Sequence, residues 1–115
     1  MIRQITGQQI ADHLKAKTPM TLVEALPEKY YREGHLPGAI NLPHDQVRQL
    51  APALLPDRNA FIVVYCANAP CRNSTIASQL LDSLGYTNVA EYVEGKQDWI
   101  EAGLPLERPE EPKAA

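Results

Sequence analysis

The stretch FIVVYCANAPCRNS, residues 61–74, decides which fold this chain is expected to adopt. Its first five residues are apolar or aromatic and rich in β-branched side chains, which is typical of a buried central strand. The strand ends at Cys66, a short loop carries Arg72, and a helical pattern begins at Ser74. Backbone N–H groups and the helix dipole at such a junction favour negative charge. We therefore expect Cys66 to lose its proton more easily than a free cysteine and to act as a nucleophile.

Strand and helix patterns alternate along the chain on both sides of this stretch. Apolar runs predict strands at residues 2–5, 20–26, 39–42, 60–65 and 89–93. Helical spacing predicts helices at residues 7–15, 27–33, 44–55, 74–84 and 95–102. Thr6 and Gln9 predict a capping box for the first helix, and Pro52 is expected to interrupt the third. The alternation predicts an α/β domain whose mostly parallel sheet has helices on both faces. Ligands bind beyond the carboxyl ends of the strands in such sheets.

Length and composition narrow the classes of function. The chain has 115 residues, enough for one domain, with 44% hydrophobic and 22% charged residues and a net charge of −3. Neither nucleic acid nor a membrane is expected as a partner, and the absence of a signal-peptide pattern predicts a cytoplasmic protein. In that compartment two cysteines five positions apart fit a reactive site better than a structural disulfide. Residues 107–115 are polar and proline-rich, and are expected to form a loose tail.

Several segments resemble the signatures of the rhodanese family. They are GHLPGAINLP at residues 34–43, the VVYC strand end at 63–66, GYTNV at 85–89, EGKQDW at 94–99 and AGLP at 102–105. The resemblance runs in the correct order from about residue 6 to residue 106, which implies a rhodanese domain over residues 1–106. It also implies a five-stranded sheet and sulfur transfer without a cofactor. In that family a cysteine thiolate attacks the outer sulfur of a small anion such as thiosulfate, sulfite leaves, and a thiophilic acceptor, which can be another thiol or a protein, takes the sulfur from the persulfide.

Carried over by position, the resemblance makes Cys66 the nucleophile. The loop amides would bind the persulfide and the donor oxygens, with Arg72 as the charged clamp. The substrate-binding residues implied are Ala67, Asn68, Ala69, Cys71 and Arg72. Cys71 is either a small residue that shapes the loop or a resolving thiol that forms a reversible disulfide with Cys66. A metal site is not expected, because no second Cys or His pair accompanies the two cysteines. His35 is expected to fix a turn rather than to act as a general base.

Three departures from the family pattern leave other functions open. The usual Val-Asp-x-Arg strand end is Val23-Glu24-Ala25-Leu26 here, so local packing and ion pairing should differ. Five residues separate Cys66 from Arg72, a length that resembles the phosphatases and arsenate reductases of the same fold. The loop has no glycine, so Asn68 and Asn73 are the best candidates for the positive φ of an anion cradle, and Pro70 removes one donor. The alternatives to a sulfurtransferase are an oxyanion enzyme of that kind and a non-catalytic sulfur carrier or redox sensor.

Overall fold

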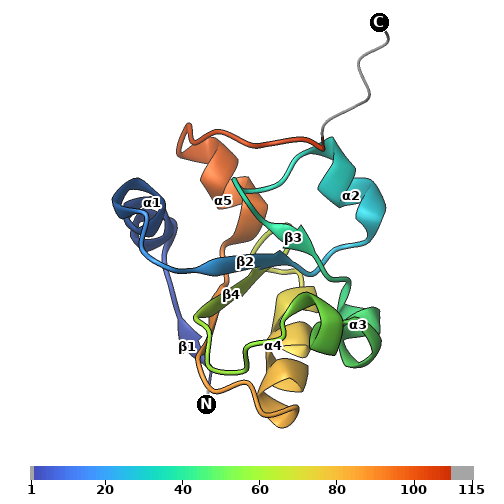
Figure 1. Ribbon diagram of the computed structural model, residues 1–115. Coiled ribbons are helices and arrows are strands. Elements are labelled where there is room, and N and C mark those ends of the chain that lie inside the picture. Colours follow the sequence, from blue (N-terminus) through green and yellow to red (C-terminus); the bar gives the residue numbers. More distant parts are fainter. Residues whose placement is uncertain (1, 110–115) are drawn as a thin grey trace, which may run out of the picture.

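The computed structural model describes residues 2–109, and these form a single five-stranded sheet (Figure 1). The strands are β1 (Arg3–Gln4), β2 (Thr21–Glu24), β3 (Ile40–Asn41), β4 (Ile62–Tyr65) and β5 (Val89–Tyr92). They lie in the order β1-β5-β4-β2-β3, and every neighbouring pair is parallel. The segment that contains Cys66 therefore follows the central strand, as expected.

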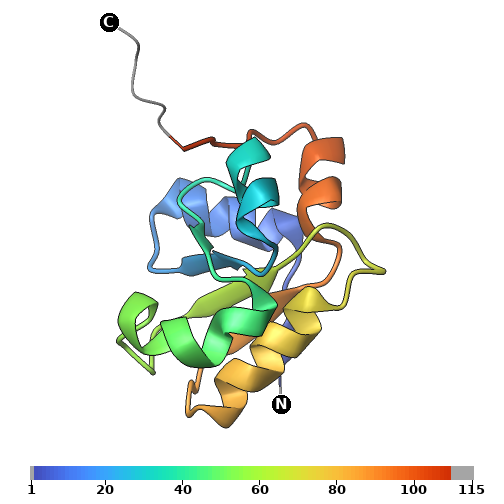
Figure 2. The same cartoon turned by 90° about the vertical axis from the view of Figure 1, so that its right-hand side faces the viewer.

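Helices cover both faces of this sheet (Figures 1 and 2). The α-helices are α1 (Gly7–Ala16), α2 (Glu28–Glu33), α3 (Val47–Leu54), α4 (Asn73–Ser83) and α5 (Gly95–Glu101), and a 3-10 turn (His44–Gln46) precedes α3. Helices α1 and α5 pack on one face, and α3 and α4 on the other. No helix among residues 2–109 is long and apolar enough to cross a bilayer. The predicted α/β architecture with helices on both faces is confirmed.

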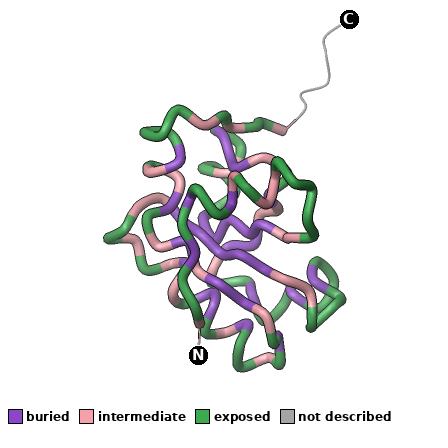
Figure 3. Tube along the Cα trace, turned by 90° about the vertical axis from the view of Figure 1, so that its left-hand side faces the viewer, coloured by how far each residue is buried: buried purple, intermediate pink, exposed green. Residues whose placement is uncertain are grey.

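The core consists of two clusters of apolar side chains, separated by the sheet. Along β4, Ile62 and Val64 point toward α3 and α4, whereas Val63 and Tyr65 point toward α1 and α5. Figure 3 shows the buried trace concentrated in the central strands. Because side chains alternate along a strand, the next residue, Cys66, falls on the α4 side.

All five predicted helices are present, with ends within three residues of the predicted ones, and the 3-10 turn occupies the start of the predicted helix 44–55. Thr6 and Gln9 form the predicted capping box, and the Gln9 amide donates to Thr6 Oγ1 at 3.1 Å. Pro52, however, lies inside α3 and does not interrupt it, so that prediction is wrong. A proline removes one N–H donor, but Pro52 and Arg48 are both exposed, so water can satisfy the carbonyl group left without a partner.

The tail was expected to begin at residue 107, but the first residues of that segment contact the domain. The backbone of Glu107 exchanges two hydrogen bonds of 2.8 Å with His35, and its Oε1 accepts from the Gly38 amide at 2.8 Å. Arg108 donates through Nε to Glu33 O at 3.1 Å. Residues 107 and 108 are therefore attached to the domain. Residues 110–115 of the predicted tail lie outside the described residues.

Candidate active site

Cys66 lies at the carboxyl end of β4, on the side of the sheet that α4 covers, and it has no exposed surface. The loop of residues 67–72 connects it to α4 and projects from the domain (Figure 2). Its thiol has one proton to donate, and two acceptors lie within reach of it, Ser74 Oγ at 3.3 Å and the carbonyl oxygen of Cys71 at 3.5 Å. The backbone N–H of Ser74 also hydrogen-bonds the sulfur and lowers its pKa. The expected position of the thiol, opposite the first turn of a helix, is thus observed.

The expected acidity of this thiol is not observed. Burial raises the pKa of Cys66, and its hydrogen bond to Cys71 raises the pKa further. The Ser74 backbone N–H and a Ser74 hydroxyl that donates to the sulfur lower the pKa, but they do not cancel the effect of burial. The prediction that Cys66 ionises more easily than a free cysteine is therefore wrong for the resting structure. Helix dipoles are weaker than the cost of removing water from a thiolate in a fully buried position.

The loop does not form the predicted cradle of amides. Neither Asn68 nor Asn73 has a positive φ. Among the non-glycine residues of 2–109, a positive φ occurs at Lys17, which is not in this loop. The Cys71 amide is already used, because it donates to the backbone oxygen of Asn68 at 3.1 Å and to its Oδ1 at 3.2 Å. Pro70 has no amide hydrogen. These bonds make a turn at residues 68–71 instead of a ring of donors.

The other predicted site residues line the same loop. Ala67, Asn68 and Cys71 are half-buried, whereas Ala69 and Arg72 are exposed. Arg72 is the N-cap residue of α4, and Ser74 lies in the first turn of that helix. Within residues 2–109 the Arg72 guanidinium has no ion pair or hydrogen bond, which leaves its donors available to an anion. Both cysteines are free thiols.

The first turn of α5 holds the start of the loop. The Lys96 amide donates to Cys66 O at 2.8 Å, and the Gln97 amide donates to Ala67 O at 2.8 Å. These contacts require a close approach at Gly95, where a Cβ atom would stand 2.6 Å from Cys66 O. The helix therefore fixes the backbone on which the thiol sits.

A buried ion pair reinforces this arrangement, and sequence reasoning did not find it. Lys96 Nζ lies 3.0 Å from Glu24 Oε1, and the Glu24 side chain has no exposed surface. Tyr65 Oη donates to the same carboxylate at 2.8 Å and accepts from the Leu36 amide at 3.1 Å. Burial raises the pKa of Glu24, while Tyr65 and Lys96 oppose that shift. The 23–26 segment lacks the arginine of the family pattern, and the cation that pairs with its Glu24 is Lys96 of α5.

Glu91 is a further polar residue beside the thiol that sequence reasoning missed. Its Oε2 accepts hydrogen bonds of 2.8 Å from Ser74 Oγ and from Thr75 Oγ1. A signal for it was present, because alternation along β5 puts Glu91 on the same face as Val89, the α4 side. His35 behaves as expected, since its Nδ1 pairs with Tyr31 O at 3.0 Å and its ring stacks on Tyr31.

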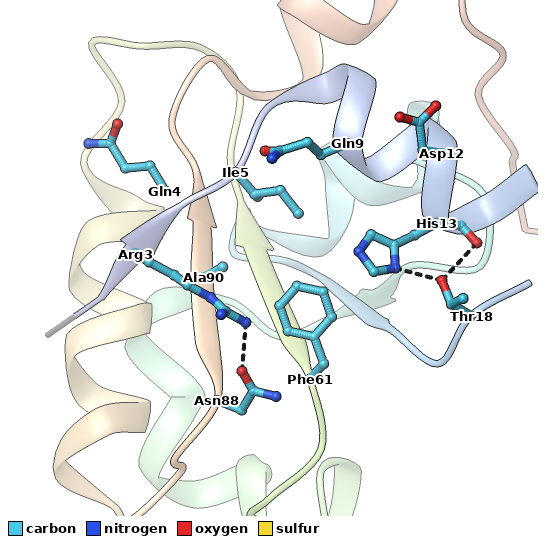
Figure 4. A pocket seen from close by; sticks show the side chains of 10 residues that line it. All are labelled: Arg3, Gln4, Ile5, Gln9, Asp12, His13, Thr18, Phe61, Asn88 and Ala90. Carbon is cyan, nitrogen blue, oxygen red and sulfur yellow. Dashed lines mark hydrogen bonds between the residues drawn. The ribbon is translucent and has the colours of Figure 1, made fainter. Parts of the chain in front are cut away.

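A hollow of about 680 Å³ lies at the other end of the sheet (Figure 4). Phe61 and Asn88, which line it, directly precede β4 and β5, so it sits at the amino ends of the strands. The Arg3 guanidinium donates a hydrogen bond to Asn88 Oδ1 at 2.7 Å, and its central carbon lies 5.1 Å from the centre of the Phe61 ring. No cysteine lines this hollow, so it takes no part in thiol chemistry. Among residues 2–109 no three His, Cys, Asp or Glu side chains are grouped as a metal ion requires.

Solved structures resemble this architecture over most of its length. A rhodanese-related protein from Thermoplasma volcanium superposes with a TM-score of 0.78 at 26% identity, covering 93% of this chain and 99% of its own. A rhodanese with anions from E. coli superposes with a TM-score of 0.65 at 29% identity, covering 78% of this chain and 99% of its own.

Sequence comparisons agree with the structural ones. The chain is 42% identical over 64 residues to the thiosulfate sulfurtransferase PspE of Escherichia coli, which covers 56% of this chain and 59% of PspE. It is 35% identical over 88 residues to the HTH-type transcriptional regulator Rv0324 of Mycobacterium tuberculosis, which covers 76% of this chain and 38% of that protein. Both matches thus span less than two thirds of the relative. Residues 6–102 match the family described as Rhodanese-like domain, and the chain belongs to the rhodanese-like family.

Proposed function

We propose that this protein is a sulfurtransferase that carries sulfane sulfur on Cys66. The observation that carries the proposal is the position of Cys66, a thiol at the carboxyl end of the central strand, held by α5 amides and opposite the first turn of α4. The similarity to a relative named thiosulfate sulfurtransferase supports a sulfur-containing anion as the donor.

The reaction would proceed in two displacements. The Cys66 thiolate attacks the outer sulfur of thiosulfate, an S–S bond forms to Sγ, and the S–S bond of thiosulfate breaks as sulfite leaves with the electron pair. A thiophilic acceptor such as cyanide or a thiol then removes the sulfur and restores the thiolate. We assign Arg72 to the sulfonate oxygens, because its guanidinium is unpaired within residues 2–109 and charge-assisted bonds to oxyanions are strong. Within loop 67–72 the backbone amides of Ala67, Asn68, Ala69 and Arg72 have no partner among residues 2–109, and they are the remaining donors.

Access is the main requirement of this mechanism. Cys66 has no exposed surface in the resting structure, so the donor reaches it only when loop 67–72 moves. The exposed positions of Ala69 and Pro70 put the tip of that loop at the surface. The anchored part is the start of the loop, where α5 amides bind the carbonyl groups of Cys66 and Ala67.

A phosphatase or arsenate reductase is less well supported, although the loop has a suitable length. A bound tetrahedral oxyanion needs several convergent amides, and here Cys71 donates within the loop while Pro70 has no N–H. A redox-sensing or sulfur-carrying domain is the second candidate. The observations that favour it are the protected thiol of Cys66 and the similarity to a relative named as a transcriptional regulator.

Steady-state assays distinguish these candidates. We expect thiocyanate to form from thiosulfate and cyanide, and Cys66→Ser to abolish it. Cys71→Ser is the matched control, because it removes the second thiol of the same loop, and it should retain at least a tenth of the rate. Hydrolysis of a phosphate monoester without thiocyanate formation would instead support the oxyanion enzyme. Sulfur loading without turnover of small acceptors would support the carrier.

A further inference from the structure

Glu91 has no role in the reaction described so far, yet it is two hydrogen bonds from the reactive sulfur. The carboxylate projects from β5 toward the first turn of α4. There it accepts from Ser74 Oγ and Thr75 Oγ1, both at 2.8 Å and both through Oε2. Ser74 in turn lies 3.3 Å from Cys66 Sγ. Cys66, Ser74 and Glu91 form a continuous chain from the thiol to a half-buried carboxylate.

The direction of the hydrogen bonds in this chain is determined by its end. A carboxylate can only accept, and a serine hydroxyl has a single proton to donate. Because Ser74 gives that proton to Glu91, it presents a lone pair to the sulfur and can only accept from the thiol, whose single proton also has the Cys71 carbonyl oxygen within reach. Ser74 and Cys66 have no exposed surface, so water does not replace either partner. Besides the Ser74 backbone N–H, a thiolate at Cys66 would need a further donor, and the Ser74 hydroxyl could provide it only by breaking its bond to Glu91.

We propose that Glu91, acting through Ser74, holds Cys66 in its protonated resting form. Ser74 touches the reacting sulfur, whereas Glu91 is a positioning residue that orients the Ser74 hydroxyl. The inference rests on the proposed role of Cys66 as the sulfur-accepting nucleophile. It explains how a reactive thiol is protected from oxidation until a donor or a movement of the loop reorients Ser74, since the thiolate and not the thiol reacts.

Burial is the largest cause of the raised pKa of Cys66, and a Ser74 hydroxyl that donated to the sulfur would lower that pKa. Glu91 withholds this donation, because its carboxylate takes the Ser74 proton. The ionisable side chains nearest to this chain of hydrogen bonds are Cys71 and Arg72 in the loop and Asp82 of α4. Tyr65 of β4, Glu24 of β2, and Lys96 and Asp98 of α5 lie on the opposite side of the sheet, and Arg3 of β1 contacts Asn88 and Phe61. Lys96 is engaged by Glu24 and Asp98 by Tyr92, and Asp82 lines a surface hollow together with Glu91.

The test is the pH dependence of Cys66 alkylation by iodoacetamide, in a Cys71→Ser background that leaves one thiol. We expect Glu91→Gln to lower the alkylation midpoint by about one pH unit, which is about a tenfold faster reaction at pH 7. Adding Ser74→Ala should remove most of that gain, because Glu91 acts through Ser74. Thr75→Val is the matched control, since it loses a hydrogen bond to the same carboxylate without touching Cys66, and its midpoint should stay that of the background.

An unchanged or raised alkylation midpoint in Glu91→Gln would overturn the inference. The same holds if the midpoint stays fully lowered when Ser74→Ala is added to Glu91→Gln. A second measurement needs no change at Glu91. The infrared S–H stretching band of the Cys71→Ser protein should persist above pH 9, and its absence at pH 8 would contradict the proposal. Thiosulfate loading measured on the same variants separates this inference from the proposed function. A lowered midpoint without any loading would reject sulfur transfer but keep the role of Glu91.

Discussion

Gly95 and Cys66 lie so close that no other residue fits at position 95. A Cβ on Gly95 would stand 2.6 Å from the Cys66 carbonyl oxygen and 2.9 Å from the Asn68 amide nitrogen. The φ of Gly95 is +70°, a conformation that side chains disfavour. This approach lets the Lys96 amide donate to Cys66 O. The backbone of Cys66 is thus positioned by a helix that follows it by about thirty residues in sequence.

Gly95→Ala should therefore impair both stability and chemistry. We expect a loss of about 2–4 kcal/mol in the free energy of unfolding, from strain at positive φ and from overpacking, and at least a tenfold loss of thiocyanate formation. Urea unfolding and steady-state assays measure the two effects. Gly103→Ala is the control, because its φ is +79° but a Cβ there meets nothing within 4 Å. Equal effects of the two substitutions would contradict the role of Gly95.

The buried Glu24–Lys96 pair should matter far more than an ion pair at the surface. Lys96→Met leaves the Glu24 carboxylate buried without its cation, which typically costs about 3–5 kcal/mol. Arg32→Met breaks the exposed pair with Glu28, whose atoms lie 3.6 Å apart, and should cost less than about 1 kcal/mol. Chemical denaturation of both variants gives the comparison. A cost below 1 kcal/mol for Lys96→Met would show that the pair is dispensable.

The raised pKa of Cys66 should be visible in the stability of the whole domain. A group that keeps its proton longer in the folded state than in the unfolded state makes stability fall as pH rises between the two pKa values. The free energy of unfolding should therefore decrease above about pH 8.5, the ordinary range of a cysteine. Cys66→Ser should flatten that decline, while Cys71→Ser should retain it. A stability that rises with pH in this window would mean that the Cys66 thiolate is favoured.

Cys71 provides a separate redox prediction. Its carbonyl oxygen is 3.5 Å from Cys66 Sγ, so the two thiols belong to one tight loop. If Cys71 resolves an oxidised Cys66, mild peroxide should give an intramolecular disulfide that Cys71→Ser prevents. Mass mapping after alkylation of free thiols measures this. Only sulfinic or sulfonic acid at Cys66, with Cys71 still reduced, would leave Cys71 with a shaping role in the loop.

The periodic parts of the fold were predictable from the sequence. Alternating apolar runs and helical stripes carry the order of elements, and residues 61–66 identify the central strand because they are apolar on both faces. Pro52 was misjudged because a proline near the end of an exposed helix loses a single hydrogen bond to a carbonyl that water can reach.

The electrostatic state of the site was not predictable in this way. The strand-to-helix junction places Cys66 correctly, but the acidity of its thiol depends on burial and on Ser74 and Cys71, whose geometry only the folded loop determines. The Glu24–Lys96 pair joins residues 72 positions apart, a distance that no local pattern spans. The position of Glu91 could have been predicted, since strand alternation alone puts its side chain on the face of the sheet that α4 covers.

Intact-mass spectrometry after incubation with thiosulfate tests the central claim most directly. The account predicts that the protein gains the mass of one sulfur atom, that cyanide removes it, and that Cys66→Ser does not gain it while Cys71→Ser does. A protein that remains unmodified under these conditions, or a Cys66→Ser variant that still gains the sulfur, would contradict sulfur transfer through Cys66.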